Sequence, residues 1–566
     1  MAKAQQLPEH LFSEIDALTE VGWKFRETQG PASVVNSAAA NMQKYMAPAR
    51  YLSGPALITG EEAVQRRLAT ELLQALTPEE MLITYCSQSF APKAKDTEYW
   101  YKTKYFVEPF EPLLARCKAP KVVAGLKLPA PNPFIAQDYA IKASPSEDFS
   151  VRPSEPEMIL DGESWRVHFK QDNRYGQPKA YAFIQISQGN DVFGQQTTPK
   201  TSAYARLLKA SLQDALNEYS YDASVAGLQY SCSFTTRGIA LSFSGYNDKL
   251  PAFVESIVTA ISTHVPNSEV KLQRYKDTIL RDLKSFGTEQ PYKHASFFAA
   301  LCKNLPAYLP TQVAEEVKAV SLQELQAWTA TVWQKGYGEM LLQGNLFEEE
   351  ARGLVRSCER AFKFAPIPQP DRAQPALVTL PVVAGGWGSV LRMDEPNVNE
   401  GNSAVYAHFQ NANRDVEAQV AMELIGSMME QPFYADLRTK QQLGYIVFAG
   451  TKNEEFSRAL VLTVQSSIAN ADYLAERIME FVDAFDAVIE NMPPAQFSTY
   501  VQGLVEQKLE MDKKLSSEAL RHWGEIVDNQ YVYDRDEREA AALRGLTQEG
   551  VLKTYREVVK TGGSER

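Results

Sequence analysis

The apolar and polar positions of this 566-residue chain follow a pattern that occurs twice. In the first block, an apolar run over 179–187 predicts a strand, and apolar residues three and four positions apart over 204–219 predict a helix with one hydrophobic face. A strand over 227–234, a Thr-Thr-Arg-Gly turn and a return strand over 239–245 predict a β-hairpin. The first block therefore predicts a strand, a helix and a hairpin, in that order.

The second block repeats this order about 215 residues later. We expect its strand over 403–409, its helix over 416–428, and its hairpin strands over 443–450 and 459–464. A repeat of this length indicates a duplicated domain and not a solenoid, whose units are roughly 20–50 residues long.

The two blocks end differently. Each has a late helix, expected over 322–333 in the first block and over 547–559 in the second. Only the first block continues into a strand, over 339–345. An antiparallel sheet that lacks its last strand has an unpaired edge. We therefore expect that the chain is truncated or that another chain supplies this strand.

Two stretches of the chain, 129–156 and 366–381, are rich in proline. Proline fixes φ and has no backbone N–H to donate, so clusters of it disfavour helices and central strands. We interpret both stretches as linkers. They divide the chain into a segment over 1–128 and two domains over 157–365 and 382–566, for which the pattern predicts an α+β fold with antiparallel sheets packed against helices.

The segment over 1–128 is expected to be mainly helical. Apolar residues recur at helical spacing over 11–25 and 62–76, and an apolar run over 81–85 is a candidate strand. These elements amount to less than one copy of the repeated block. The chain is therefore expected to begin partway through a domain.

Composition and charge exclude several classes of protein. With 58 Lys and Arg against 70 Asp and Glu, the net charge of −12 argues against general binding to nucleic acid or to anionic lipid. No apolar run is long enough for a membrane span. The five cysteines are scattered, and the N-terminal sequence has no apolar stretch of the signal-peptide type. These features indicate a cytoplasmic protein without nucleic-acid or membrane partners.

The residues alone do not complete a catalytic site. A zinc hydrolase needs three protein ligands and a base, but none of the six histidines belongs to a His-Glu-x-x-His or His-x-x-Glu-His motif. The chain also has no Gly-x-Ser-x-Gly nucleophile elbow and no phosphate-binding Gly-x-x-x-x-Gly-Lys loop. A complete metal site is therefore not expected in this chain.

One stretch, residues 431–450, places polar side chains around a helix-to-strand turn. Arg438 and Tyr445 flank this turn, which contains Gly444. Arginine provides a fixed charge and several donors, and a tyrosine at such a turn can pack its ring while its hydroxyl group donates a hydrogen bond. From the residues alone, Arg438 is interpreted as a surface or capping residue and Tyr445 as a core aromatic, with a functional role as the alternative for both.

The sequence Leu-Arg-Thr-Lys-Gln-Gln-Leu-Gly-Tyr, which ends at Tyr445, closely resembles a motif of the insulin-degrading enzyme and pitrilysin family of zinc metallopeptidases. The motif belongs to the C-terminal half of those proteins. Other segments match the family in the same order, among them Thr97-Glu-Tyr-Trp-Tyr101, Gly245-Tyr-Asn-Asp-Lys249 and Trp523-Gly-Glu-Ile526. The similarity covers nearly all 566 residues without reordering.

The resemblance implies one half of a clam-shell peptidase chamber. The family has four homologous α/β roll domains in two halves. This chain matches the end of the second domain (1–128), the third domain (157–365) and the fourth domain (382–566), whose last strand is missing. Zinc is expected on the missing N-terminal half and none on this chain. The implied partners are that catalytic half, upstream in the same chain or as a separate chain, and peptide substrates; a homo-oligomer is left open.

The resemblance also implies roles for three residues. In the family, the residues that match Arg438 and Tyr445 reach across the chamber to the substrate near the zinc ion, and the aromatic residue that matches Tyr434 lines the substrate pocket. The implied function is that of a non-catalytic half of a zinc metalloendopeptidase, which encloses peptides and is inactive alone. The alternative is a catalytically inactive scaffold or a peptide-binding subunit with the same fold.

Overall fold

The structure, a computed structural model, describes residues 7–58, 60–109, 111, 115, 127–143, 151–379, 388–455 and 457–560. Contacts divide the chain into two compact units, one up to Ile135 and one from Ala136 onward. No helix within the described ranges is long and apolar enough to cross a membrane.

The residues described in the N-terminal unit include four α-helices and a short hairpin. These are α1 (Glu9–Lys24), α2 (Pro31–Met42), α3 (Arg50–Ser53), α4 (Glu62–Ala75), and β1 (Asp96–Thr97) paired with β2 (Lys104–Tyr105). The helices predicted over 11–25 and 62–76 are confirmed as α1 and α4. The strand predicted over 81–85 is wrong, because these residues are exposed and form no regular element. A strand needs the backbone of a partner, and no described strand pairs with this segment.

The larger unit contains two rolls, and the first roll is built on a seven-stranded sheet. The strand order is β3-β4-β9-β5-β7-β6, with β10 alongside β9, and β9 runs parallel to β4 and antiparallel to β5. The elements of the first roll are β3 (Glu157–Asp161), β4 (Trp165–Gln171), β5 (Lys179–Ser187), α6 (Pro199–Val225), β6 (Gln229–Thr235), β7 (Gly238–Tyr246), α7 (Leu250–Thr263), α8 (Glu269–Ser285), α9 (Pro291–Lys303), β8 (Asn304–Leu305), α10 (Pro310–Ala319), α11 (Leu322–Val332), β9 (Lys335–Gly344), α12 (Glu348–Ala361) and β10 (Ala365–Pro366).

Local sequence explains where these elements begin and how closely they pack. The side chain of Thr198 accepts a hydrogen bond from the backbone N–H of Thr201, and Pro199 occupies the first turn, so α6 begins at a capping box. At Gly338 of β9, an added Cβ atom would lie 2.1 Å from the ring of Trp165, so only glycine fits there. The sheet can therefore bring β9 and β4 together.

The second roll repeats the first in a shorter form. Its elements are β12 (Ser403–Gln410), α13 (Val416–Phe433), a π-helical turn (Tyr434–Lys440), β13 (Ile446–Glu454), β14 (Ser457–Ser466), α14 (Ala471–Glu490), α15 (Pro494–Lys508), α16 (Leu515–Val527), α17 (Arg535–Gly545), α18 (Gln548–Thr554) and a second π-helical turn (Tyr555–Lys560). The sheet order β12-β14-β13 corresponds to β5-β7-β6 of the first roll. Among the described residues, no strand lies beside β12 at the place that β9 takes beside β5. The predicted mixture of helices and antiparallel strands is confirmed.

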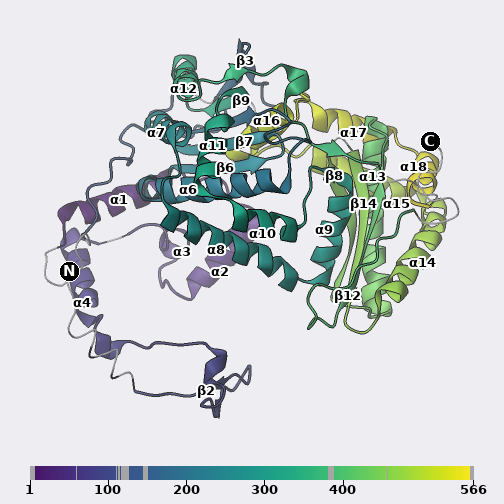
Figure 1. The fold of residues 1–566 in the computed structure, drawn as a ribbon, viewed down its shortest axis with the longest axis horizontal. Coiled ribbons are helices and arrows are strands. Elements are labelled where there is room, and N and C mark those ends of the chain that lie inside the picture. The colour runs from purple at the N-terminus through teal and green to yellow at the C-terminus, as the bar shows by residue number, and fades with distance from the viewer. Residues whose placement is uncertain are drawn as a thin grey trace. The chain divides into compact units, whose positions relative to one another are not determined.

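Each roll contributes one helix that packs on the sheet of the other roll (Figure 1). Helix α16 of the second roll packs on β9 and β5 of the first, where the rings of Trp523 and Phe183 stack with centroids 5.6 Å apart. Helix α9 of the first roll packs on β12 and β14 of the second. Both are the third helix after the hairpin of their roll. The contact between the rolls is therefore reciprocal.

Buried polar groups accompany this contact. The ammonium group of Lys170 lies 2.9 Å from the carboxylate of Glu518, and both side chains are almost fully buried. The amide of Gln343 donates to Glu518 at 2.8 Å, and its oxygen lies 2.9 Å from Nδ1 of His522. Burial lowers the pKa of His522 to about 2, with help from the charge of Arg521, so this imidazole is neutral. It therefore donates its Nδ1–H to Gln343.

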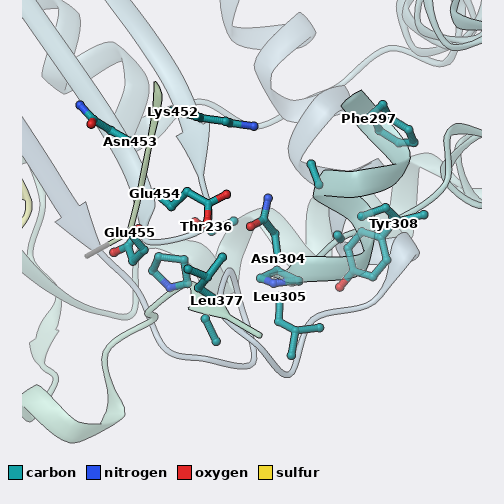
Figure 2. Close-up of a pocket in the computed structure, with 16 residues that line it drawn as sticks. Thr236, Phe297, Asn304, Leu305, Tyr308, Leu377, Lys452, Asn453, Glu454 and Glu455 are labelled. Carbon is teal, nitrogen blue, oxygen red and sulfur yellow. The ribbon is translucent and has the colours of Figure 1, made fainter. Parts of the chain in front are cut away.

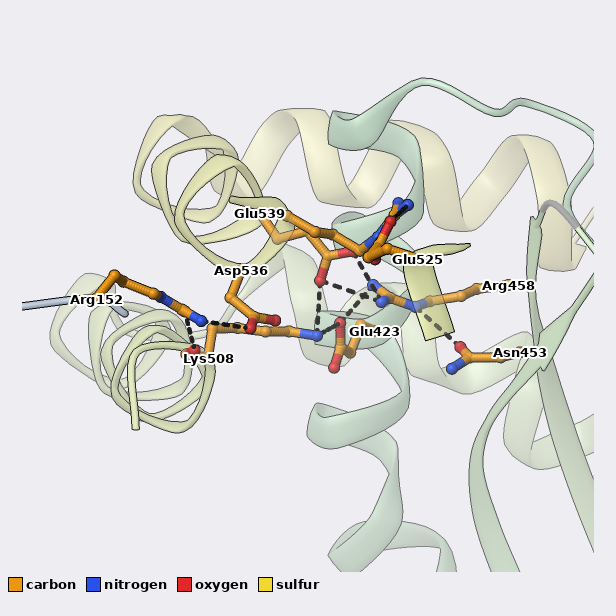
Figure 3. A network of polar contacts seen from close by, with 9 residues as sticks. Arg152, Glu423, Asn453, Arg458, Lys508, Glu525, Asp536 and Glu539 are labelled. Carbon is orange, nitrogen blue, oxygen red and sulfur yellow. Dashed lines mark hydrogen bonds and ion pairs between the residues drawn. The ribbon is translucent and has the colours of Figure 1, made fainter. Parts of the chain in front are cut away.

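A second, partly buried network joins the helices of the second roll to its sheet (Figure 3). Arg458 of β14 lies 2.5 Å from Glu423 of α13 and 3.0 Å from Glu539 of α17. Lys508 of α15 lies 2.9 Å and 2.7 Å from the same two carboxylates. Arg152, which precedes the first roll, donates to the carbonyl oxygen of Lys508 at 3.3 Å. The alternation of two cations with two carboxylates offsets the cost of burying each charge.

Glu518→Ala should lower the free energy of unfolding by about 3 kcal/mol or more, because the ammonium group of Lys170 loses the carboxylate that faces it in a buried site. The midpoint of urea unfolding measures the effect. As a control, Glu348→Ala removes the partner of Arg352 in an exposed pair and should cost less than about 1 kcal/mol. An equal loss of unfolding free energy in the two variants would contradict a buried charge contact between the rolls.

Candidate functional site

The turn that carries the predicted site residues leads from α13 into β13. The π-helical turn from Tyr434 to Lys440 follows α13 directly, and Gln442 then adopts a φ of 54°. At Gly444 an added Cβ atom would lie 1.9 Å from the carbonyl oxygen of Gln465 in β14. Glycine is therefore required at this position, because the turn passes directly over the backbone of the neighbouring strand.

The structure brings the three predicted site residues into one stack. The guanidinium carbon of Arg438 lies 4.8 Å from the ring centroid of Tyr434 and 4.4 Å from that of Tyr445. These distances fit cation–π contacts on both rings. Tyr445 is 78% exposed, so its interpretation as a core aromatic is wrong. We call this group the Tyr-Arg-Tyr cluster.

The polar ends of the cluster are available to a ligand. Within the described part of the chain, no residue forms a hydrogen bond or ion pair with the guanidinium group of Arg438 or with the hydroxyl group of Tyr445. The nearby carboxylate of Asp436 accepts instead from the amide of Gln441 at 3.0 Å. The cluster therefore presents oriented donors and a positive charge, the groups that stabilise negative charge on an oxygen atom of a bound molecule.

The position of the cluster depends on the first roll as well as the second. Gln465 pairs across the sheet with Ile446, the residue after Tyr445. Its side-chain oxygen accepts from the backbone N–H of Tyr292 in α9 at 3.1 Å, and its amide donates to Gln290 at 3.3 Å. The strand that supports the turn is thus held by the N-terminus of α9.

A pocket of about 450 Å³ is the second candidate site (Figure 2). Its wall comes from the C-terminal half of α9 and the following residues, from a segment at 375–377 and from the end of β13. Figure 2 shows the side chains of Lys452, Glu454 and Asn304 around its centre. Apolar side chains such as Phe297 complete the lining.

Three titratable groups from both rolls meet beside this pocket. Nζ of Lys303 lies 2.5 Å from Nε2 of His408 and 2.5 Å from the carboxylate of Glu454, and His408 lies 2.9 Å from Glu454. Burial works to raise the pKa of Glu454, but hydrogen bonds from His408 and Lys303 outweigh it and lower that pKa to about 2. Burial lowers the pKa of both His408 and Lys303. The carboxylate is therefore charged and His408 neutral near pH 7.

Sequence reasoning missed this second site, because its residues come from segments separated by as many as about 200 positions and share no motif. It found the Tyr-Arg-Tyr cluster only because those residues belong to one continuous stretch that resembles a family motif.

The residues that the structure describes do not fit a zinc ion. No group of three or more His, Cys, Asp or Glu side chains among them could hold a metal. The Lys303–His408–Glu454 group contains a lysine in place of a third ligand, so it also does not fit a metal ion.

Comparisons with known proteins bear on the whole chain. A family model described as the middle or third domain of peptidase M16 matches residues 23–316. A second model, described as the C-terminal lobe domain 4 of PqqF-like PQQ synthase proteins, matches residues 424–523. The human protein named insulin-degrading enzyme is 29% identical over 584 residues, which cover 100% of this chain and 54% of that protein.

Solved structures show the same fold. The crystal structure of pitrilysin superimposes with a TM-score of 0.72 at 19% identity, over 99% of this chain and 57% of that one. The crystal structure of a peptidase M16 inactive domain from Pseudomonas fluorescens has a TM-score of 0.52 at 13% identity, over 72% of this chain and 96% of that one. The chain spans about half the length of the curated relatives it matches.

Gly444→Ala should lower the free energy of unfolding by about 1–3 kcal/mol, because the added methyl group collides with the backbone of Gln465 and the turn must shift. Urea unfolding measures this loss. Gly503→Ala is the matched control, since this exposed glycine of α15 has no atom within 4 Å of the new Cβ. It should leave stability unchanged or raise it by up to about 1 kcal/mol. A harmless Gly444→Ala would contradict the close approach described above.

Proposed function

The chain belongs to the peptidase M16 family, and on that premise we propose that it is the half of a metalloendopeptidase that holds no metal. In this role it encloses peptide substrates together with an N-terminal catalytic half, which is joined upstream in the same chain or supplied as a separate chain. The similarity to insulin-degrading enzyme and the chain's span of about half that protein support this division.

The observation that carries the proposal is the Tyr-Arg-Tyr cluster. Hydrolysis of a peptide bond places negative charge on the oxygen of the scissile carbonyl group. The guanidinium group of Arg438, a half-buried residue, stacks on the ring of the exposed Tyr445, so the two side chains present their donors side by side where they can stabilise that charge. Tyr434 holds the other face of Arg438 and contributes a ring to the substrate contact.

Zinc, the metal of this family, is assigned to the N-terminal half. The described residues of this chain do not fit the ion, and this chain alone is therefore proposed to be inactive. Its contribution is to bind the peptide, to orient it and to place donors at the reacting carbonyl group.

The cytoplasm is the proposed compartment. Cys86 and Cys302 are free and exposed, and Cys232 and Cys358 are free as well. Exposed thiols persist in a reducing compartment.

The second candidate function is a catalytically inactive scaffold or a peptide-binding subunit. It is favoured by the structural likeness to the Pseudomonas fluorescens protein, which is named as an inactive domain. A scaffold has no need of free donors at Arg438 and Tyr445, so the effect of their substitution on turnover separates the two functions.

Tyr445→Phe should lower kcat/KM for cleavage of an internally quenched peptide by roughly 10²–10³-fold in the assembly with the catalytic half, because one hydroxyl donor to the reacting oxygen is lost. The control is Tyr473→Phe, which removes the hydroxyl group of another exposed tyrosine of the second roll, in α14. That variant should cleave at the parent rate. Unchanged cleavage by Tyr445→Phe would exclude the catalytic contact and favour the scaffold.

A further inference from the structure

Strand β13 forms an open edge of the sheet in the second roll. It pairs with β14 from Ile446 to Glu454. Within the described residues, no second strand pairs with it, since the sheet order is β12-β14-β13. Helix α13 packs against the core face of β13, where Val447 and Ala449 are buried. It therefore covers a face of the strand and does not take the position of a further strand at its edge.

The register of the hairpin shows which backbone groups face outward. β13 and β14 meet at the Glu454–Ser457 pair, and the closing pair of a hairpin with two intervening residues exchanges hydrogen bonds. Pairing then alternates along the strand. The N–H and C=O groups of Val447, Ala449 and Thr451 therefore point away from β14, and none of these N–H groups has another described backbone partner.

This edge lacks the features that usually protect one. Exposed edges are commonly protected by charged side chains, proline or a bulge. From Ile446 to Thr451 the strand has no charged residue and no proline, and its register with β14 is continuous. The side chain of Phe448 is 42% exposed on the face opposite the core. An extended chain placed along the edge would pair with the outward groups and cover this ring.

The start of the edge coincides with the Tyr-Arg-Tyr cluster. β13 begins one residue after Tyr445, so a peptide paired with the strand would run directly to the exposed hydroxyl group of that tyrosine. We propose that β13 is a docking strand to which an extended segment of the peptide substrate adds by backbone hydrogen bonds. This mode of binding selects for an extended backbone and tolerates many side chains. The inference rests on the proposed function, because it takes peptides as the substrate class.

Hydrogen exchange with residue-level readout tests the docking strand in the isolated chain. The probe is the insulin B chain with its cysteines oxidised to sulfonic acids. At a probe concentration about ten times the Kd, exchange at Val447, Ala449 and Thr451 should slow about tenfold. Exchange at Phe448 and Gly450 should change little, because pairing with β14 already protects those amides. Equal slowing at all five positions, slowing only elsewhere, or no binding up to millimolar probe would each overturn the proposal.

A pair of substitutions at Thr451 provides the second test. Thr451→Pro removes an outward N–H group of an edge strand and should weaken binding of the probe about fivefold or more. Thr451→Val keeps that N–H group and should bind as the parent does. Equal affinity of the two variants would overturn the docking strand. If the assembly cleaves peptides and responds to Tyr445→Phe but shows no alternating protection, the docking strand is wrong and the proposed function stands. If the alternating protection is seen but the assembly cleaves no peptide, the docking strand stands and the proposed function is wrong.

Discussion

The reciprocal packing of α9 and α16 is the contact on which the rest of the larger unit depends. Each helix belongs to one roll and covers the sheet of the other. The contact between α16 and the first sheet also buries the Lys170–Glu518 pair and the neutral His522. Such groups tolerate little displacement, because a charge or donor moved away from its partner in a buried site loses more than it would in water. The two rolls are therefore held in one relative position.

That fixed position explains how the first roll, which contributes no member of the Tyr-Arg-Tyr cluster, still determines where the cluster lies. The N-terminus of α9 holds the side chain of Gln465, and the backbone of Gln465 supports the turn at Gly444. The backbone of the turn that carries Arg438 and Tyr445 is consequently held relative to both sheets. Donors that must meet a developing charge without reorganising need such a rigid support.

The sequence predicted most elements of the two rolls, because strands such as β5 and helices such as α6 bury continuous or periodic apolar positions. It failed at 81–85, where an apolar run pairs with no strand that the structure describes, since pairing is a tertiary property that local pattern does not contain. The exposure of Tyr445 was equally beyond local pattern, and only the family motif suggested a role for it. The Lys303–His408–Glu454 group could not be predicted, because its three residues meet only when the rolls pack.

The proposed function requires that Tyr445 of this chain contacts the reacting part of a bound peptide. Photo-crosslinking from position 445 tests it most directly, with Tyr445→p-azidophenylalanine in the assembly with the catalytic half and a peptide that is cleaved at one known bond. Crosslinks are expected to the residues on either side of that bond, mapped by mass spectrometry. Crosslinks only to distant residues of the peptide, or only to the protein, would contradict it.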